Sequence, residues 1–171
     1  GQEFPVQLLK SQMGVSSETM LNGSIESLEY EFANAIHNLK RFQKPRVALI
    51  EGHGELNKIE TASLATSLAE TYVVDRIAIN EELSSLTERV IVDSTREYAV
   101  MRKYDVIIIA KPTQKFSEKD KFIIDQYVMY GGRVVWLVDP VFASMDSLQN
   151  ADVSMAIPMD LNLDDQLFTY G

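Results

Sequence analysis

Ionisable side chains stand at the ends of three apolar runs in the chain. Glu51, His53 and Glu55 close the first run, Lys111 follows the second, and Asp139 follows the third. If the runs are parallel strands of one sheet, their carboxyl ends meet at one edge, which is where open α/β sheets bind ligands. We therefore expect these five residues to form a rim that binds a ligand, for example a glycan.

The same side chains could also ligate a metal ion, since imidazole and carboxylate groups are common metal ligands. The chain has only two histidines and no cysteine, however, and its histidines do not stand at zinc-ligand spacing. We therefore expect no metal site. A structural ion pair is another interpretation of these charges, with Lys111 bonded to Glu51 or to Asp139.

Gly52 and Gly54 follow an apolar run and precede a helical pattern, as the glycines of phosphate-binding loops do. The third glycine and the Lys-Ser/Thr pair of such loops are missing, and Glu51 and Glu55 would repel a phosphate. No Ser or Cys occupies a strand-to-helix elbow with a base nearby. The sequence therefore predicts no cofactor and no enzyme activity. A hydrolase that uses two carboxylates stays open as an alternative, and it requires a pocket that holds both.

Apolar runs alternate with helical patterns through the second part of the chain, and runs that are apolar throughout are typical of parallel strands covered on both faces. This alternation predicts an α/β fold with an open parallel sheet and helices on both faces, in a flavodoxin-like arrangement. The polar segment 80–101 is expected to hold a small insertion. Strands are predicted at residues 46–51, 72–79, 105–110 and 133–138, and helices at 57–70, 117–130 and within 161–168.

The helix after residue 116 carries signals for both of its ends. Ser117 and Asp120 match the capping-box pattern, in which a hydroxyl at the start of a helix accepts a bond from a free backbone N–H. Gly131 and Gly132 are typical of a helix C-terminus.

An amphipathic helix is also predicted near the N-terminus, after a short strand at residues 4–9 and a cap at Ser16 or Ser17. Its apolar positions recur at alternating steps of four and three, which places them on one face. That face either packs on its own domain or pairs with a partner helix. We treat residues 1–44 as this strand and helix, and residues 45–171 as the α/β domain. The apolar positions are Leu21, Ile25, Leu28, Phe32, Ala35 and Leu39.

The overall composition narrows the class of protein. With 46% hydrophobic and 24% charged residues, the chain has the composition of a globular protein. Its formal charge of -9 repels phosphate backbones, so a nucleic-acid partner is not expected. The apolar runs are far shorter than the ~20 residues of a membrane-spanning helix, and no signal peptide is recognisable. We expect the chain to be a piece of a longer protein.

Six segments together resemble the gliding-motility-associated ABC-transporter auxiliary protein family (GldG-like). The resemblance covers nearly the whole chain, and its motifs are long. The segments are residues 30–36, 51–56, 108–113, 116–127, 131–140 and 160–168.

This resemblance implies a bacterial inner-membrane protein of the Bacteroidetes kind, whose extracytoplasmic region partners an ABC ATPase and a permease. It also implies a fold similar to the class I glutamine amidotransferases, whose nucleophile is a cysteine that this chain lacks. We therefore expect a non-catalytic periplasmic fragment that acts by assembly with transporter subunits. Its contact with the membrane would run only through helices that are not part of this chain. Binding of a ligand at the rim is the alternative.

Overall fold

The computed structural model describes residues 3, 5–11, 14–40, 43–91, 98–142 and 157–171. The chain divides into two compact units, Gly1–Lys44 and Pro45–Gly171.

The first unit contains one long helix, α1 (Ser17–Lys40). The side chain of Ser16 accepts the backbone N–H of Thr19 at 3.3 Å, so Ser16 is the cap of the two that were predicted. Within this unit much of the predicted apolar face stays open, since Leu21, Ile25 and Phe32 are each at least half exposed. The unit by itself therefore does not cover this face.

The strand predicted at residues 4–9 is wrong for its described part, because residues 5–9 form no strand. Among the described residues of its unit, this segment has no neighbouring strand to complete a ladder. It is attached to the helix by side chains instead. The backbone N–H of Lys10 donates to Ser24 Oγ at 3.0 Å, and Lys10 Nζ lies 3.0 Å from Glu31 Oε1.

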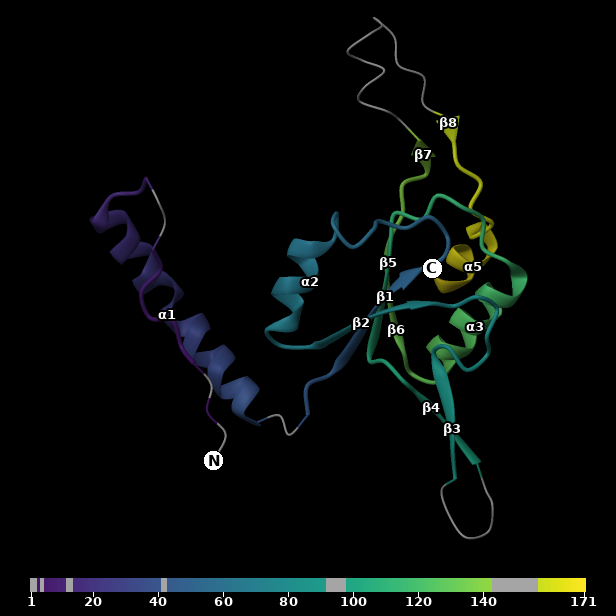
Figure 1. Ribbon diagram of the computed structural model, residues 1–171, viewed down its shortest axis with the longest axis horizontal. Coiled ribbons are helices and arrows are strands. Elements are labelled where there is room, and N and C mark those ends of the chain that lie inside the picture. The colour runs from purple at the N-terminus through teal and green to yellow at the C-terminus, as the bar shows by residue number, and fades with distance from the viewer. Residues whose placement is uncertain (1–2, 4, 12–13, 41–42, 92–97, 143–156) are drawn as a thin grey trace, which may run out of the picture. The chain divides into compact units, whose positions relative to one another are not determined.

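The second unit is built on a four-stranded parallel sheet with the order β2-β1-β5-β6 (Figure 1). The predicted α/β fold with an open parallel sheet is confirmed. The flavodoxin-like and amidotransferase-like assignments stay predictions. The strands of the sheet are β1 (Arg46–Glu51), β2 (Val73–Ala78), β5 (Val106–Ala110) and β6 (Arg133–Leu137), and the helices are α2 (Ala62–Ala69), α3 (Glu118–Met129) and α5 (Asp164–Tyr170).

Helices cover both faces of this sheet, as predicted, with α2 on one side and α3 and α5 on the other (Figure 1). Because successive side chains of a strand point to opposite faces, β1 contributes to two cores. Val47 and Leu49 pack with the α2 side, and Ala48 and Ile50 pack with the α3 side. The core on the α3 side is the larger, and α3 contributes the buried side chains of Ile123, Ile124 and Tyr127 to it.

Two small antiparallel pairs branch from the sheet. The segment predicted to hold an insertion forms a hairpin of β3 (Thr87–Ile91) and β4 (Tyr98–Arg102). The second pair is β7 (Val141–Phe142) with β8 (Ile157–Pro158).

The helix predicted from residue 57 begins later, at Ala62, because Asn57 forms a turn of its own. The Asn57 side chain accepts the N–H groups of Ile59 and Glu60 at 2.8 and 3.1 Å. Asn favours such local side-chain bonds over helix continuation.

The start of α3 shows the hydroxyl bond of the predicted capping box, but the Asp120 carboxylate bonds to His53 and Glu81 rather than back to the start of the helix. The end of α3 follows the predicted glycine signal. Ser117 Oγ accepts the N–H of Asp120 at 3.1 Å, and Gly131 adopts a φ of +83° just after the helix. Tyr127 points from this helix into the core and donates to the carbonyl of Tyr104 at 3.1 Å. Burial raises the pKa of Tyr127 to about 12. Helix α3, which carries Asp120 of the candidate site in its first turn, is therefore held at both ends.

Candidate functional site

The predicted rim lies at the carboxyl ends of β1, β5 and β6. Its first part is the turn after β1, in which Gly52 and Gly54 adopt φ values of +117° and +72°. Gly54 also lies so close to the loop after β5 that a Cβ atom there would overlap Thr113 Oγ1. Glycine is therefore required at position 54 both for its backbone conformation and for this close approach.

His53, between the two glycines, is buried in a network of carboxylates. Its Nε2 lies 3.0 Å from Asp120 Oδ2, and its Nδ1 lies 3.3 Å from Glu55 Oε1. The side chains of all three are at most 7% exposed. The imidazole also stacks on Phe116, with ring centroids 3.9 Å apart. Because both ring nitrogens face carboxylates, neither is free to act as a base or to bind a metal.

Burial and hydrogen bonding act on the pKa of His53 in opposite directions. Burial lowers it, because a charged imidazolium loses its hydration. The hydrogen bonds to Glu55 and Asp120, with the charges of both carboxylates, outweigh burial, and the pKa is raised above its usual value. The two carboxylates therefore favour the protonated form of the imidazole, whose charge would neutralise part of this acidic cluster.

Asp120 connects the network to a third segment of the chain. Its Oδ1 accepts the backbone N–H of Glu81 at 2.8 Å, in the loop after β2. The sequence identified Asp120 only as part of a helix cap, so its partnership with His53 was missed. A buried histidine needs partners, but nothing in the spacing of positions 53 and 120 indicates that they meet.

The five predicted rim residues fall into three separate groups. His53 and Glu55 are together, as described. Lys111 and Asp139 form an ion pair, with Nζ and Oδ2 3.3 Å apart and both side chains about half exposed. Glu51 turns toward β2 and pairs with Arg76, which also contacts Thr61. The predicted alternative of a Lys111 ion pair is therefore present, with Asp139 as its partner.

The strand order changes direction between β1 and β5, and this is the place where open α/β sheets bind ligands. In this domain the loops after β1 and β5 are hydrogen-bonded to each other at that place. The carbonyl of His53 accepts the N–H groups of Thr113 and Gln114 at 2.9 and 2.8 Å, and Thr113 Oγ1 donates to the carbonyl of Gly54 at 3.1 Å. The polar backbone groups of both loops thus satisfy one another.

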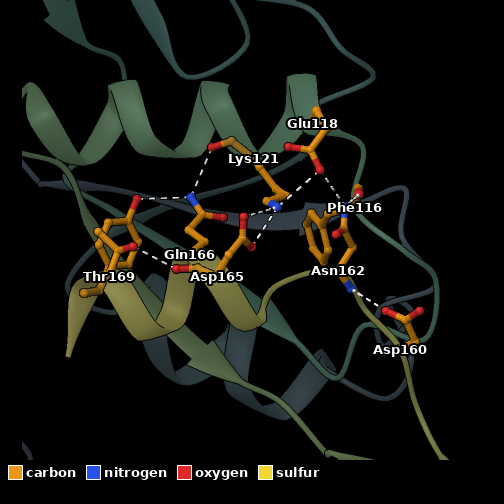
Figure 2. Close-up of polar contacts among 9 residues, drawn as sticks. Phe116, Glu118, Lys121, Asp160, Asn162, Asp165, Gln166 and Thr169 are labelled. Atoms are coloured by element: carbon orange, nitrogen blue, oxygen red, sulfur yellow. Dashed lines mark hydrogen bonds and ion pairs between the residues drawn. The ribbon is translucent and has the colours of Figure 1, made fainter.

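A second polar cluster attaches α5 to α3 (Figure 2). Lys121 Nζ lies 2.7 Å from Asp165 Oδ1 and 3.3 Å from Glu118 Oε1, and its side chain is 8% exposed. Asn162 donates to Glu118 at 2.9 Å and to the carbonyl of Phe116 at 3.0 Å. These bonds position the loop before α5. Asp160 and Asn162 of this loop give it a superficial likeness to a calcium-binding loop.

One carboxylate of that loop and one of the first turn of α5 are paired with lysines. Asp160 bonds to Lys115, and Asp165 bonds to Lys121. In the part of the chain that the structure describes, no three His, Asp or Glu side chains are grouped to hold a metal ion. No helix among the described residues is long and apolar enough to cross a membrane.

Together, these features define an open-sheet α/β domain whose strand-end loops are bonded to each other around a buried His–carboxylate network. The chain belongs to the ABC_transp_aux family, described as an ABC-type uncharacterized transport system, whose model matches residues 44–171. Membership supports an accessory role in ABC-type transport and implies association with transporter components. No curated protein and no solved structure matches this chain.

Proposed function

We propose that the α/β domain is a non-catalytic assembly module of a gliding-motility-type ABC transport system of a Bacteroidetes bacterium. In this proposal the domain lies in the periplasm and contacts the ATPase–permease complex. The family match over residues 44–171 carries the proposal. The geometry of the rim supports it, because both nitrogens of His53 are engaged by buried carboxylates and the adjoining loops are bonded to each other.

The proposal is tested by affinity purification of the tagged full chain from detergent-solubilised membranes of its source bacterium. An ABC permease and its ATPase should be enriched and identified by mass spectrometry. A tagged chain with its α/β domain deleted serves as the control. Equal recovery of both subunits by that control would contradict the proposal, and so would their absence from the wild-type sample under mild cross-linking.

Binding of a carbohydrate at the rim is the second candidate. It is favoured by the Lys111–Asp139 pair, which is half exposed at the ends of two neighbouring strands and could exchange its partner for a sugar hydroxyl or carboxylate. A panel of neutral and acidic glycans should raise the melting temperature of the wild type, because a ligand of the native state stabilises it. The Lys111→Met variant should lose that increase. A glycan that stabilises both proteins equally would place its site elsewhere.

A further inference from the structure

A groove with a volume of about 780 Å³ opens in the second unit, and none of the five predicted rim residues lines it. Three segments line it: one face of α3, the loop after β2, and the β3–β4 hairpin. None of these residues was singled out from the sequence as a candidate site.

The walls of this groove carry large apolar side chains that remain open to solvent. Phe122 of α3 and Tyr130, which caps the end of α3, are 52% and 43% exposed, and Leu83 in the loop after β2 is 65% exposed. Val100 of β4 lines the same space. Aromatic side chains gathered around a concave surface are typical of the energetic centre of a protein interface.

Carboxylates border the apolar walls. Glu82 and Glu88 both line the groove, and neither makes a salt bridge with another residue that the structure describes. Glu81 is paired with Lys119 at 3.0 Å, and Arg89 is a cation in the lining. The groove is therefore apolar with an acidic border, which complements a segment with an apolar face and basic flanks.

The loop that forms one wall is held in place before any partner arrives. Asn80 and Glu81 adopt φ values of +48° and +58°, and the N–H of Glu81 donates to buried Asp120. Ile79 and Leu86, which flank the loop, are fully buried. A preformed wall avoids the entropic cost of ordering a loop on binding.

We propose that this groove docks a cationic amphipathic helix of a transport-system subunit. An apolar groove that receives the apolar face of a helix is a recurring mode of peptide recognition, with anchors spaced one turn apart. The basic residues of the helix would pair with Glu82 and Glu88. The source of the helix rests on the proposed function, whereas the chemistry of the groove does not.

The binding chemistry is tested with a fluorescent lysine–leucine amphipathic helical peptide and a glutamate–leucine peptide of equal length, titrated with the full chain. Fluorescence anisotropy should show binding of the lysine peptide that weakens with salt, and much weaker binding of the glutamate peptide. Phe122→Ser should weaken binding at least about thirtyfold, as expected for an interface anchor. The Glu82→Lys/Glu88→Lys variant should weaken it about tenfold.

Matched controls distinguish binding at the groove from nonspecific binding of the peptide elsewhere on the chain. Phe168→Ser removes an aromatic ring that is 89% exposed on α5, and Glu26→Lys/Glu29→Lys makes the same charge change on α1. Both controls should bind the lysine peptide as the wild type does. Equal binding of the two peptides, or equal losses in groove and control variants, would overturn the inference.

The same variants distinguish this inference from the assembly proposal. If wild type and Phe122→Ser enrich the ABC permease and ATPase equally from membranes, assembly stands and the groove is not the docking site. If the wild type enriches neither subunit, assembly fails, while the peptide titration still decides the chemistry of the groove. Loss of both subunits in the groove variants alone, with unchanged circular dichroism, supports both.

Discussion

Polar groups are paired with one another at the strand-end rim, whereas the groove beside α3 has exposed apolar side chains and carboxylates without a salt bridge to another described residue. At the rim, His53 is enclosed by Glu55 and Asp120, and the loops after β1 and β5 bond to each other. At the groove, Phe122 is half exposed and Glu88 makes no salt bridge with a described residue. The two regions share one hydrogen bond, which the backbone N–H of Glu81 donates to Asp120.

This contrast indicates that one region contributes mainly to stability and the other mainly to binding of a partner. Buried charges that are fully paired specify a conformation, and removing one partner leaves the others desolvated and unpaired. Exposed apolar side chains and unpaired carboxylates contribute little to folding and are available to a partner. We therefore expect the rim to control stability and the groove to control binding.

The largest effect is expected from removing the imidazole at the rim. His53→Ala leaves two buried carboxylates without their shared partner, and it should lower the free energy of unfolding by about 3–5 kcal/mol. Urea denaturation followed by Trp136 fluorescence measures it, because this single tryptophan packs in the core on the α3 side. A loss below that of an exposed ion pair would show that the network is not structural.

A smaller loss is expected where the two rim loops meet. Gly54→Ala places a methyl group on Thr113 Oγ1 and an L-residue at a φ of +72°, and it should cost about 1–3 kcal/mol. Adding Thr113→Ala removes the overlap and should recover part of the stability, measured by the same urea titration. If the double variant recovers nothing, steric contact between the loops is not the cause.

The pH dependence of stability should be smaller again, because deprotonation removes one charge and leaves every side chain in place. The pKa of His53 is raised in the folded state above its unfolded value of about 6.5. Its stabilisation is therefore complete below that unfolded value and is lost as pH rises through the folded pKa.

Urea titrations across this pH range should show the loss in the wild type and a flatter profile in His53→Gln. The NMR signal of the imidazole gives an independent check of the folded pKa, since the chain has only two histidines. A folded pKa below that of the unfolded chain would reverse the sign and refute the assigned role of the carboxylates.

The smallest effects are expected at exposed positions of both regions. Lys111→Ala breaks a half-exposed ion pair and should change stability by about 0–1 kcal/mol. Phe122→Ser, in the groove, should stay within about 0.5 kcal/mol while it weakens peptide binding. Thermal unfolding of both variants beside His53→Ala tests the division directly. A large loss of stability in Phe122→Ser would show that the groove belongs to the folding core, and it would contradict the division between the two regions.

Much of the second unit could be predicted from local patterns. Three of the four parallel strands, β1, β5 and β6, are largely apolar, and the alternation of strands with helices indicates an open α/β sheet. The start of β1 at Arg46 and the cap at Ser117 are local signals that tertiary packing did not override. The strand expected at residues 4–9 is wrong in its described part, residues 5–9, because its pairing depends on a neighbour that the sequence alone does not supply.

The candidate site was predicted only in part. The sequence placed charged residues at strand ends correctly, and it included the pairing of Lys111 with Asp139 as an alternative. It did not separate Glu51 from the other rim residues, because the pairing of Glu51 with Arg76 depends on the register of β1 against β2. The groove was missed, since its walls come from three segments that are unremarkable by themselves.

The amino-acid sequence by itself determined the main strands and helices of the second unit, and that the chain belongs among ABC-transport auxiliary proteins. Those properties depend on local periodicity, caps and long motifs, which are all readable along the chain. Only the tertiary structure decided that Asp120 meets His53 and that Leu83 and Phe122 line one groove. These residues are far apart in the sequence and meet because the sheet order and core packing bring them together. No local sequence pattern indicates which of them will meet.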